Sequence, residues 1–181
     1  MSQILNLYDL LTGYDSVAID TCAILNEGFI PLLAESAKQI SKSERAIIIH
    51  SSVINEIIRF SQNPYHNQYE TSKRLLPILY ELERAKIVKF EGNYWDFRLA
   101  DQQFLEFIID GRQNKTIAII TLDKDLSADI MLQNQINSFY GYPAVVFTLG
   151  KDKNLYRYRS IVSIRKKVAT VEKYKKLFHI L

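Results

Sequence analysis

Cross-linking and metal-ligating residues are scarce in this chain of 181 residues. Its one cysteine, Cys22, rules out an intramolecular disulfide and a structural zinc finger, and its three histidines lack the spacing of metal ligands. No apolar run approaches the ~18 residues of a membrane span, and the N-terminus shows no basic segment followed by an apolar run. We therefore expect a cytoplasmic protein without a signal peptide or membrane association.

Proline and glycine are scarce too, and four prolines and six glycines leave little linker material. Apolar residues make up 48% and charged residues 24% of the chain, which is the balance of a globular domain rather than of a disordered one. The length fits one domain. We expect that domain over residues 1–150 and a basic C-terminal segment over residues 151–181.

Charge is unevenly distributed between these two parts. Residues 151–181 contain ten Lys or Arg and two acidic residues, net +8, while residues 1–150 contain 13 basic and 18 acidic residues, net −5. An acidic body with a basic end suits an acidic metal site beside a surface that binds a polyanion. A solvated, lysine-rich helix is the plain alternative.

The basic segment has two further patterns. Apolar residues at steps of three and four from Ile161 to Leu181 predict an amphipathic helix docked on the domain. A contact with a homo-oligomer or another protein is the second interpretation, and a helix on a membrane surface is the third. Tyrosines alternate with cations near its start, where bases could stack while cations track phosphates, or where the tyrosines could pack on the sheet. The cations expected to contact nucleic acid are Lys151, Lys153, Arg157 and Arg159.

Short apolar runs rich in β-branched residues alternate with helical patterns along residues 17–149, which predicts an α/β fold of three layers around a mainly parallel sheet. The expected strands are 17–20, 46–50, 87–90, 116–121 and 142–149. The expected helices are 22–41 with a break near Gly28 and Pro31, 51–60, 67–86, 97–109 and 126–136.

Four carboxylates are placed where such a sheet would bring them together. Asp20 and Asp123 follow directly on apolar runs, Glu56 lies just past another, and Asp101 opens a helical segment. Ligands of open parallel sheets bind beyond the carboxyl ends of the strands. Clustered carboxylates repel one another unless a hard cation such as Mg²⁺ or Mn²⁺ neutralises them. The sequence therefore predicts metal-assisted phosphate chemistry.

The segments that carry these acids resemble, in order, the four acidic motifs of PIN-domain ribonucleases. The four segments are 18–25, 52–57, 100–105 and 120–126. The resemblance implies an α/β/α sandwich and a divalent-metal-dependent endonuclease that acts mostly on RNA, single-stranded or structured. Membership of the toxin subgroup, with an antitoxin as partner, stays open because the basic segment is not part of the family's core pattern.

Carried over residue by residue, the resemblance makes Asp20, Glu56, Asp101 and Asp123 the metal-binding acids. We expect Asp20 and Asp123 to contact the metal most directly, because both follow strands, and the other two acids to act through water or as second ligands.

Three neighbouring residues carry over in supporting roles. Thr21 and Thr121 would orient the carboxylates or a bound water, and Asp125 would be an extra acid of the fourth motif. Cys22 departs from the family pattern, which has Asn or Ser at this position, so we expect a weakened or lost hydrogen bond there.

Each acid also has a purely structural interpretation. Asp20 could only cap a helix, and Asp123 with Asp125 could only shape a turn. Asp129 would be a solvated helix residue, and Cys22 a small buried side chain rather than a nucleophile.

The other two acids have structural alternatives as well. Glu56 could pair with Arg59 or Arg98 on the surface. Asp101 could simply be an acid in a first helical turn, which would leave Asp96 as the better ligand.

Two other functions compete with the nuclease. A phosphohydrolase of the haloacid-dehalogenase type would use Asp20 as its nucleophile, but that family expects an aspartate where this chain has Cys22. A non-catalytic RNA-binding or scaffold protein on a PIN-like fold would have no need for four clustered acids.

Overall fold

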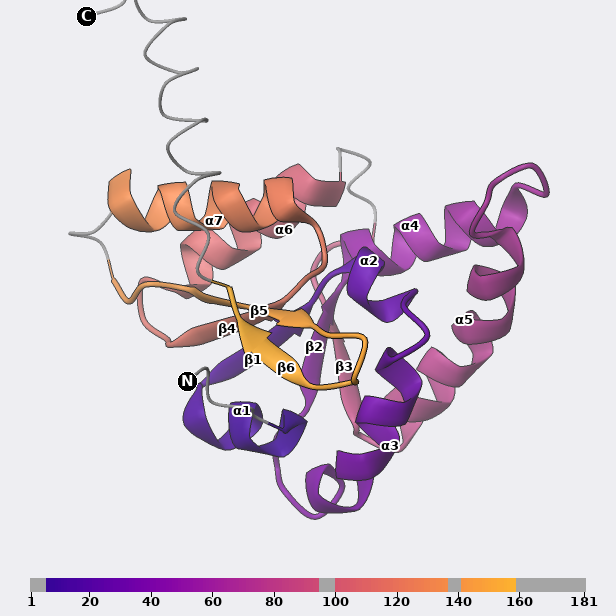
Figure 1. Cartoon of the computed structure of the whole chain (residues 1–181), viewed down its shortest axis with the longest axis horizontal. Coiled ribbons are helices and arrows are strands. Elements are labelled where there is room, and N and C mark those ends of the chain that lie inside the picture. The colour runs from indigo at the N-terminus through magenta and orange to yellow at the C-terminus, as the bar shows by residue number, and fades with distance from the viewer. Residues whose placement is uncertain (1–5, 95–99, 137–140, 159–181) are drawn as a thin grey trace, which may run out of the picture.

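One six-stranded sheet organises the described part of the chain, and the computed structural model describes residues 6–94, 100–136 and 141–158 (Figure 1). The strands are β1 (Ser16–Ile19), β2 (Ile47–His50), β3 (Val88–Glu91), β4 (Ile117–Ile120), β5 (Val145–Leu149) and β6 (Leu155–Arg157). The helices are α1 (Leu7–Gly13), α2 (Thr21–Ile24), α3 (Phe29–Ile40), α4 (Ser51–Gln62), α5 (Tyr69–Arg84), α6 (Ala100–Gly111) and α7 (Lys124–Ile136).

The strand order β3-β2-β1-β4-β5-β6 creates a reversal at the centre of the sheet. Strands β1 to β5 are parallel to their neighbours, and β6 is antiparallel to β5. From β1 the chain first moves outward to β2 and β3, and then returns across the sheet to β4 on the other side of β1. Ligands of open α/β sheets bind at the carboxyl ends of the strands beside such a switch point, which here lies between β1 and β4.

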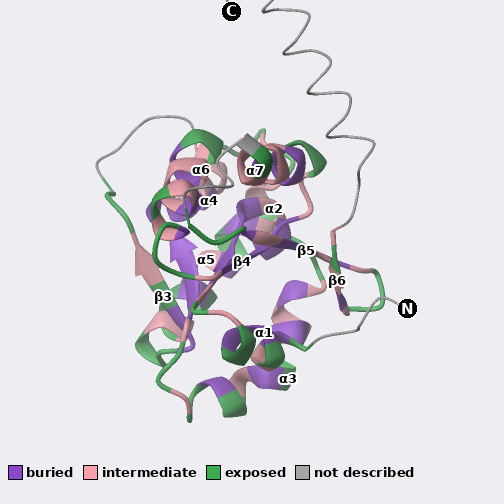
Figure 2. Ribbon diagram, turned by 90° about the vertical axis from the view of Figure 1, so that its left-hand side faces the viewer, coloured by how far each residue is buried: buried purple, intermediate pink, exposed green. Residues whose placement is uncertain are grey.

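Helices lie on both faces of the sheet, with α6 and α7 on one face and α1 and α3 on the other (Figure 1). The predicted α/β class with a mainly parallel sheet is confirmed, and the arrangement is compatible with a three-layer sandwich. Residues 17–19, 47–50 and 117–120 are all buried, because the three central strands are covered on both faces (Figure 2). Such strands read as continuous apolar runs rather than as alternating ones.

Helix breaks and short elements account for the differences from the sequence-based expectation. The predicted break near Gly28 is present, since α2 ends at Ile24 and Pro31 lies in the first turn of α3, where proline is tolerated. The structure adds α1 and β6, which the sequence analysis did not predict. The expected C-terminal helix over 161–181 lies outside the described residues. None of the helices in the described ranges has both the length and the apolar character needed to cross a bilayer.

Two Asp–Thr pairs clamp the two ends of the β1–β4 pair. Before β1, Asp15 Oδ2 accepts hydrogen bonds from Thr116 N at 2.8 Å and Thr116 Oγ1 at 2.7 Å. After β1, Asp20 Oδ2 accepts a hydrogen bond from Thr121 Oγ1 at 2.8 Å. The partners in both pairs are 101 residues apart. Apolar strands buried on both faces carry little polar pattern to fix their register, and these two pairs supply it.

Asp15→Ala should lower the free energy of unfolding at pH 7, because it removes the two hydrogen bonds that the Asp15 carboxylate accepts from Thr116 before β4. The side-chain and backbone hydrogen bonds from Thr116 lower the pKa of Asp15 below its ordinary value of 3.8. A lowered folded-state pKa gives stability that is complete above the unfolded-state pKa and is lost as the pH falls through the folded-state pKa. Urea unfolding should therefore show a gap between wild type and variant at pH 7 that narrows in acid below pH 4.

The matched control is Asp110→Ala, which removes another exposed aspartate at the end of α6. The loss of unfolding free energy in Asp15→Ala should exceed that in Asp110→Ala. An equal loss in the two variants, or a loss in Asp15→Ala that grows in acid, would contradict the proposed role of the Asp15–Thr116 pair.

Candidate functional site

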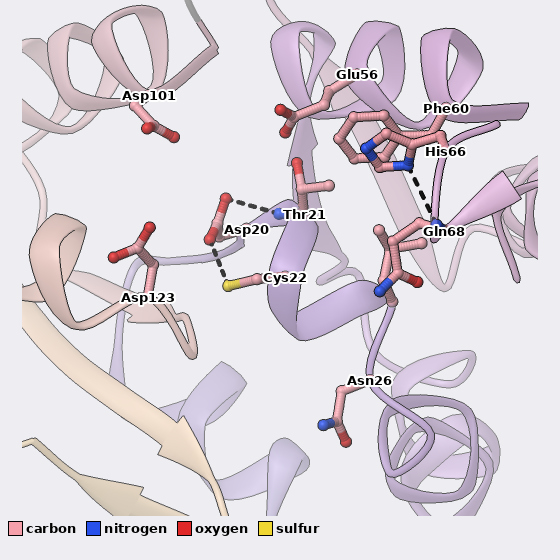
Figure 3. Close-up of a pocket in the computed structure, with 11 residues that line it drawn as sticks. Asp20, Thr21, Cys22, Asn26, Glu56, Phe60, His66, Gln68, Asp101 and Asp123 are labelled. Atoms are coloured by element: carbon pink, nitrogen blue, oxygen red, sulfur yellow. Dashed lines mark hydrogen bonds between the residues drawn. The ribbon is translucent and has the colours of Figure 1, made fainter. Parts of the chain in front are cut away.

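The four predicted acids line one cavity of about 400 Å³ at the carboxyl ends of β1 and β4 (Figure 3). Asp20 follows β1, Asp123 follows β4, Glu56 lies on α4, and Asp101 lies in the first turn of α6. In Figure 3, Asp101 and Asp123 occupy one side of the cavity, Glu56 the other, and Asp20 the space between them. The fold thus brings acids from four separate segments to the switch point of the sheet.

Asp20 is held by three hydrogen-bond donors at the floor of this cavity. It is 6% exposed. Its Oδ1 accepts from the backbone N–H of Thr21 at 2.7 Å, so Asp20 does cap α2 as the structural interpretation expects. Its Oδ2 accepts from Thr121 Oγ1 at 2.8 Å and from Cys22 Sγ at 2.8 Å. A carboxylate fixed in this way is oriented for binding as well as for capping.

Thr121 connects the two acids that follow the central strands. Its hydroxyl donates to Asp20 and accepts from the backbone N–H of Asp123 at 3.0 Å. Asp123 Oδ1 in turn accepts from the backbone N–H groups of Asp125 at 2.6 Å and Leu126 at 3.1 Å. Asp123 therefore shapes the start of α7 while it lines the cavity, and Asp125 lies exposed in the first turn of α7.

Glu56 faces the cavity from α4. Burial raises the pKa of its carboxyl, and the charges of Asp20 and Asp101 raise it further, while the hydroxyl of Thr21 lowers it. Thr21 Oγ1 is buried and points toward Glu56 in Figure 3. Among the described residues, no atom lies within hydrogen-bonding geometry of this oxygen. The Glu56 carboxylate also lies 3.5 Å from Arg59, a side chain that is 71% exposed. This weak, solvated pair leaves Glu56 available to the cavity.

Asp101 shares the electric field of the other acids. Burial raises the pKa of its carboxyl, and the charges of Asp20, Asp123 and Asp129 raise it further. Asp129 is half-buried on α7 and is not the solvated helix residue that the sequence suggests. The alternative ligand Asp96 and the alternative Glu56 partner Arg98 lie outside the described residues.

Within the described ranges, no three acidic, histidine or cysteine side chains converge closely enough to hold a metal ion. The chemistry of the donors nevertheless fits a hard cation, because the cavity offers four carboxylates and the hydroxyl of Thr21. Mg²⁺ typically binds through one or two carboxylates and keeps several of its waters. Asp20 and Asp123 would hold such an ion, with Glu56 and Asp101 reached through water.

Cys22 keeps hydrogen bonds at the position where the sequence predicts a weakened or lost one. Its Sγ donates to Asp20 and accepts from the backbone N–H of Leu122 at 3.2 Å, and a thiol is a weak donor and acceptor. Burial, followed by the charge of Asp20, raises the pKa of the Cys22 thiol to about 12. The thiol therefore stays protonated at neutral pH and acts as a donor to Asp20 rather than as a nucleophile.

The sequence analysis missed the wall of the cavity opposite Asp101 and Asp123. Phe60, His66, Gln68 and Asn26 line this wall, together with Leu25 (Figure 3). One signal was present, because Phe60 lies four residues after Glu56 and therefore on the same face of α4. His66 and Gln68 lie in the connection between α4 and α5, where no sequence periodicity marks them.

The predicted nucleic-acid-binding cations separate into two groups. Lys151 and Lys153 are exposed in the turn that follows β5, at the same edge of the sheet as the four acids. The end of β5, directly before this turn, adjoins the segment after α2, since a Cβ added at Gly28 would lie 3.2 Å from the side chain of Leu149. Arg157 lies back along β6, paired with Phe147, and Arg159 lies outside the described residues.

Comparison of the chain with protein-family models, with curated proteins and with solved structures finds no match in any of the three. The PIN-domain resemblance stays a prediction from the motifs.

Thr121→Val should reduce the free energy of unfolding by about 1–3 kcal/mol, because it leaves a buried carboxylate and a backbone N–H without their shared partner. Thr121→Ser keeps the hydroxyl and should retain most of the stability. Urea unfolding of both variants measures the difference. Equal stability of the valine and serine variants would show that the Thr121 hydroxyl does not bridge Asp20 and Asp123.

Proposed function

We propose that the protein is a divalent-metal-dependent endoribonuclease that hydrolyses RNA phosphodiester bonds at the cavity lined by Asp20, Glu56, Asp101 and Asp123. The observation that carries this proposal is the meeting of four acids from four separate segments at the switch point of a parallel sheet. Two of their carboxyl groups have raised pKa values, chiefly through burial and then through repulsion by their neighbours. Such a costly concentration of negative charge is typical of functional sites.

The four acids would have different roles, according to their positions in the cavity. Asp20 is fixed by Thr21, Thr121 and Cys22 and offers a rigid anchor, while Asp123 is fixed by the start of α7. A divalent ion bound there supplies an activated water and neutralises charge on the phosphoryl group. Glu56 and Asp101, whose raised pKa values favour proton uptake, are placed to hold a proton or orient a water across the cavity.

A phosphohydrolase that attacks with Asp20 is less well supported. Both carboxylate oxygens of Asp20 accept hydrogen bonds, and the side chain is 6% exposed. Hydrogen bonds on both oxygens make the carboxylate a poorer nucleophile, while a lone pair stays available to a metal ion. The residue two positions later is Cys22, whose protonated thiol cannot take over the role of a second carboxylate.

Purified protein should cleave single-stranded RNA with Mn²⁺ or Mg²⁺ and should not cleave it in EDTA. Asp20→Asn/Asp123→Asn should reduce the cleavage rate by roughly 1,000-fold, which corresponds to about 4 kcal/mol of transition-state stabilisation. Gel analysis of a mixed cellular RNA and of single-stranded DNA would measure the rate and define the substrate class.

The control is Glu35→Gln/Asp110→Asn, which removes the same charge from two exposed acids outside the cavity. Its rate should match that of the wild type. Mn²⁺ should also raise the melting temperature of the wild type and of this control, but not of the Asp20→Asn/Asp123→Asn variant. Cleavage that survives in the Asp20→Asn/Asp123→Asn variant, or in EDTA, would refute the proposed site.

The turn after β5 provides a second test of the same function, through affinity rather than rate. Lys151→Gln/Lys153→Gln should weaken RNA binding and reduce the slope of log K against log[salt] by about 1.4, if each lysine neutralises one phosphate of a single strand. Fluorescence anisotropy in EDTA at several salt concentrations measures both quantities.

Lys42→Gln/Lys86→Gln is a closely matched control for these lysines. Both residues precede parallel strands and so lie at the opposite edge of the sheet. Lys86 has φ of 59° and Lys153 has φ of 64°, so each pair also replaces one residue in the left-handed region. If both double variants reduce the slope of log K against log[salt] equally, the lysines act through net charge and not through a defined RNA path.

A further inference from the structure

The wall of the cavity opposite Asp101 and Asp123 includes an aromatic surface, a stacked pair of rings, that the cleavage chemistry does not use. The rings of Phe60 and His66 are stacked, with centroids 3.9 Å apart and planes inclined by 10° (Figure 3). Both side chains are half-buried, and both line the same cavity as the four acids. Phe60 belongs to α4, and His66 to the connection between α4 and α5.

His66 is held in one orientation and one tautomer. Its Nδ1 accepts a hydrogen bond from the backbone N–H of Gln68 at 3.1 Å. The neutral ring therefore carries its proton on Nε2, which leaves a donor on the edge of the stacked pair. Phe60 is fixed by its place on α4, so the surface is formed before any ligand arrives.

Groups suited to a nucleotide surround this surface. The Arg59 guanidinium lies over the Phe60 ring, 5.9 Å from its centroid, so a solvent-exposed cation adjoins the stacked pair. The side chains of Gln68 and Asn26 line the cavity next to it. Each amide has donors and an acceptor, and base edges are recognised by such pairs of groups.

We propose that Phe60, His66 and Gln68 form a nucleobase subsite for single-stranded RNA, in which an unpaired base stacks on the aromatic pair. The placement of its phosphate beside the acids rests on the proposed nuclease function. The cavity of about 400 Å³ falls within the range of small-ligand sites, roughly 300–1,000 Å³. A base inside a duplex is already stacked on both faces, so the subsite selects unpaired RNA.

The competing explanation is that Phe60 and His66 only pack the α4–α5 connection onto α4. That role would affect stability alone. A base subsite would in addition distinguish RNA with bases from RNA without them, and this difference is the readout that separates the two explanations.

The test compares binding of the full-length protein to five labelled RNA pentamers in EDTA, which prevents cleavage. Four are A5, C5, G5 and U5, and the fifth has abasic ribose at every position. All five carry the same phosphates, so electrostatic terms cancel in the comparison. By anisotropy, the wild type should bind at least one base-bearing pentamer about tenfold more tightly than the abasic one.

Substitutions assign this preference to the aromatic pair. Phe60→Leu should bring the ratio of base-bearing to abasic affinity close to one, while His66→Phe should keep most of it because a phenyl ring still stacks. The matched control is Tyr80→Leu, which removes a 40% exposed aromatic residue on α5 outside the cavity and should leave the ratio unchanged. Melting temperatures of all variants confirm that they are folded.

NMR of the wild type tests the subsite without any substitution, so the result does not depend on whether a variant folds. The best-bound pentamer should shift the ring protons of His66 upfield, as expected for a stacked base, and the abasic pentamer should not.

Equal binding of base-bearing and abasic pentamers, or a preference that survives Phe60→Leu, would overturn the subsite. Metal-dependent cleavage could persist in that case, and the nuclease proposal would stand. A base preference that depends on Phe60 without any metal-dependent cleavage would support the subsite and refute the nuclease.

Discussion

The parallel pairing of β1 with β4 is the constraint on which the site depends. Ile19 lies opposite Ile120, so the residues that follow, Asp20 and Thr121, lie side by side at the carboxyl end of both strands. A slip of one residue would turn every side chain of β1 to the opposite face of the sheet. Asp15–Thr116 resists that slip at one end and Asp20–Thr121 at the other. The bond that anchors the first acid of the cavity therefore also fixes the register of the fold.

The sheet was predictable from sequence where its signals are local. Runs such as 47–49 and 117–120 are continuous, apolar and rich in β-branched residues, and burial on both faces favours that composition. The short strand β6 has three residues and exists through its pairing with β5, a tertiary contact that periodicity does not encode. The helix α1 has a local signal in the sequence, because Asn6 and Asp9 form a capping box, which marks the start of a helix.

The site was predictable to the same extent. The four acids could be found because each stands near a strand end or helix start, where topology decides that they meet. Asp129 and His66 could not be found, because their place depends on how α7 packs beside α6 and how the α4–α5 connection folds back. The hydrogen bond from Cys22 to Asp20 depends on the position of the thiol in the folded chain, which the sequence alone does not give.

The helix α4 contributes to both sides of the cavity, the acidic side and the aromatic side. It presents Glu56 and, one turn later, Phe60, so any rotation of the helix moves the acid and the aromatic surface together. Its start is fixed to β2, because His50 Nδ1 accepts from the backbone N–H of Ser52 at 3.3 Å. The sheet thus sets the distance between the acids of β1 and β4 and the stacked rings of Phe60 and His66. If the rings bind a base and the acids act on its phosphate, the distance between these two sites must match the length of one nucleotide. That distance is set by the backbone and not by flexible side chains.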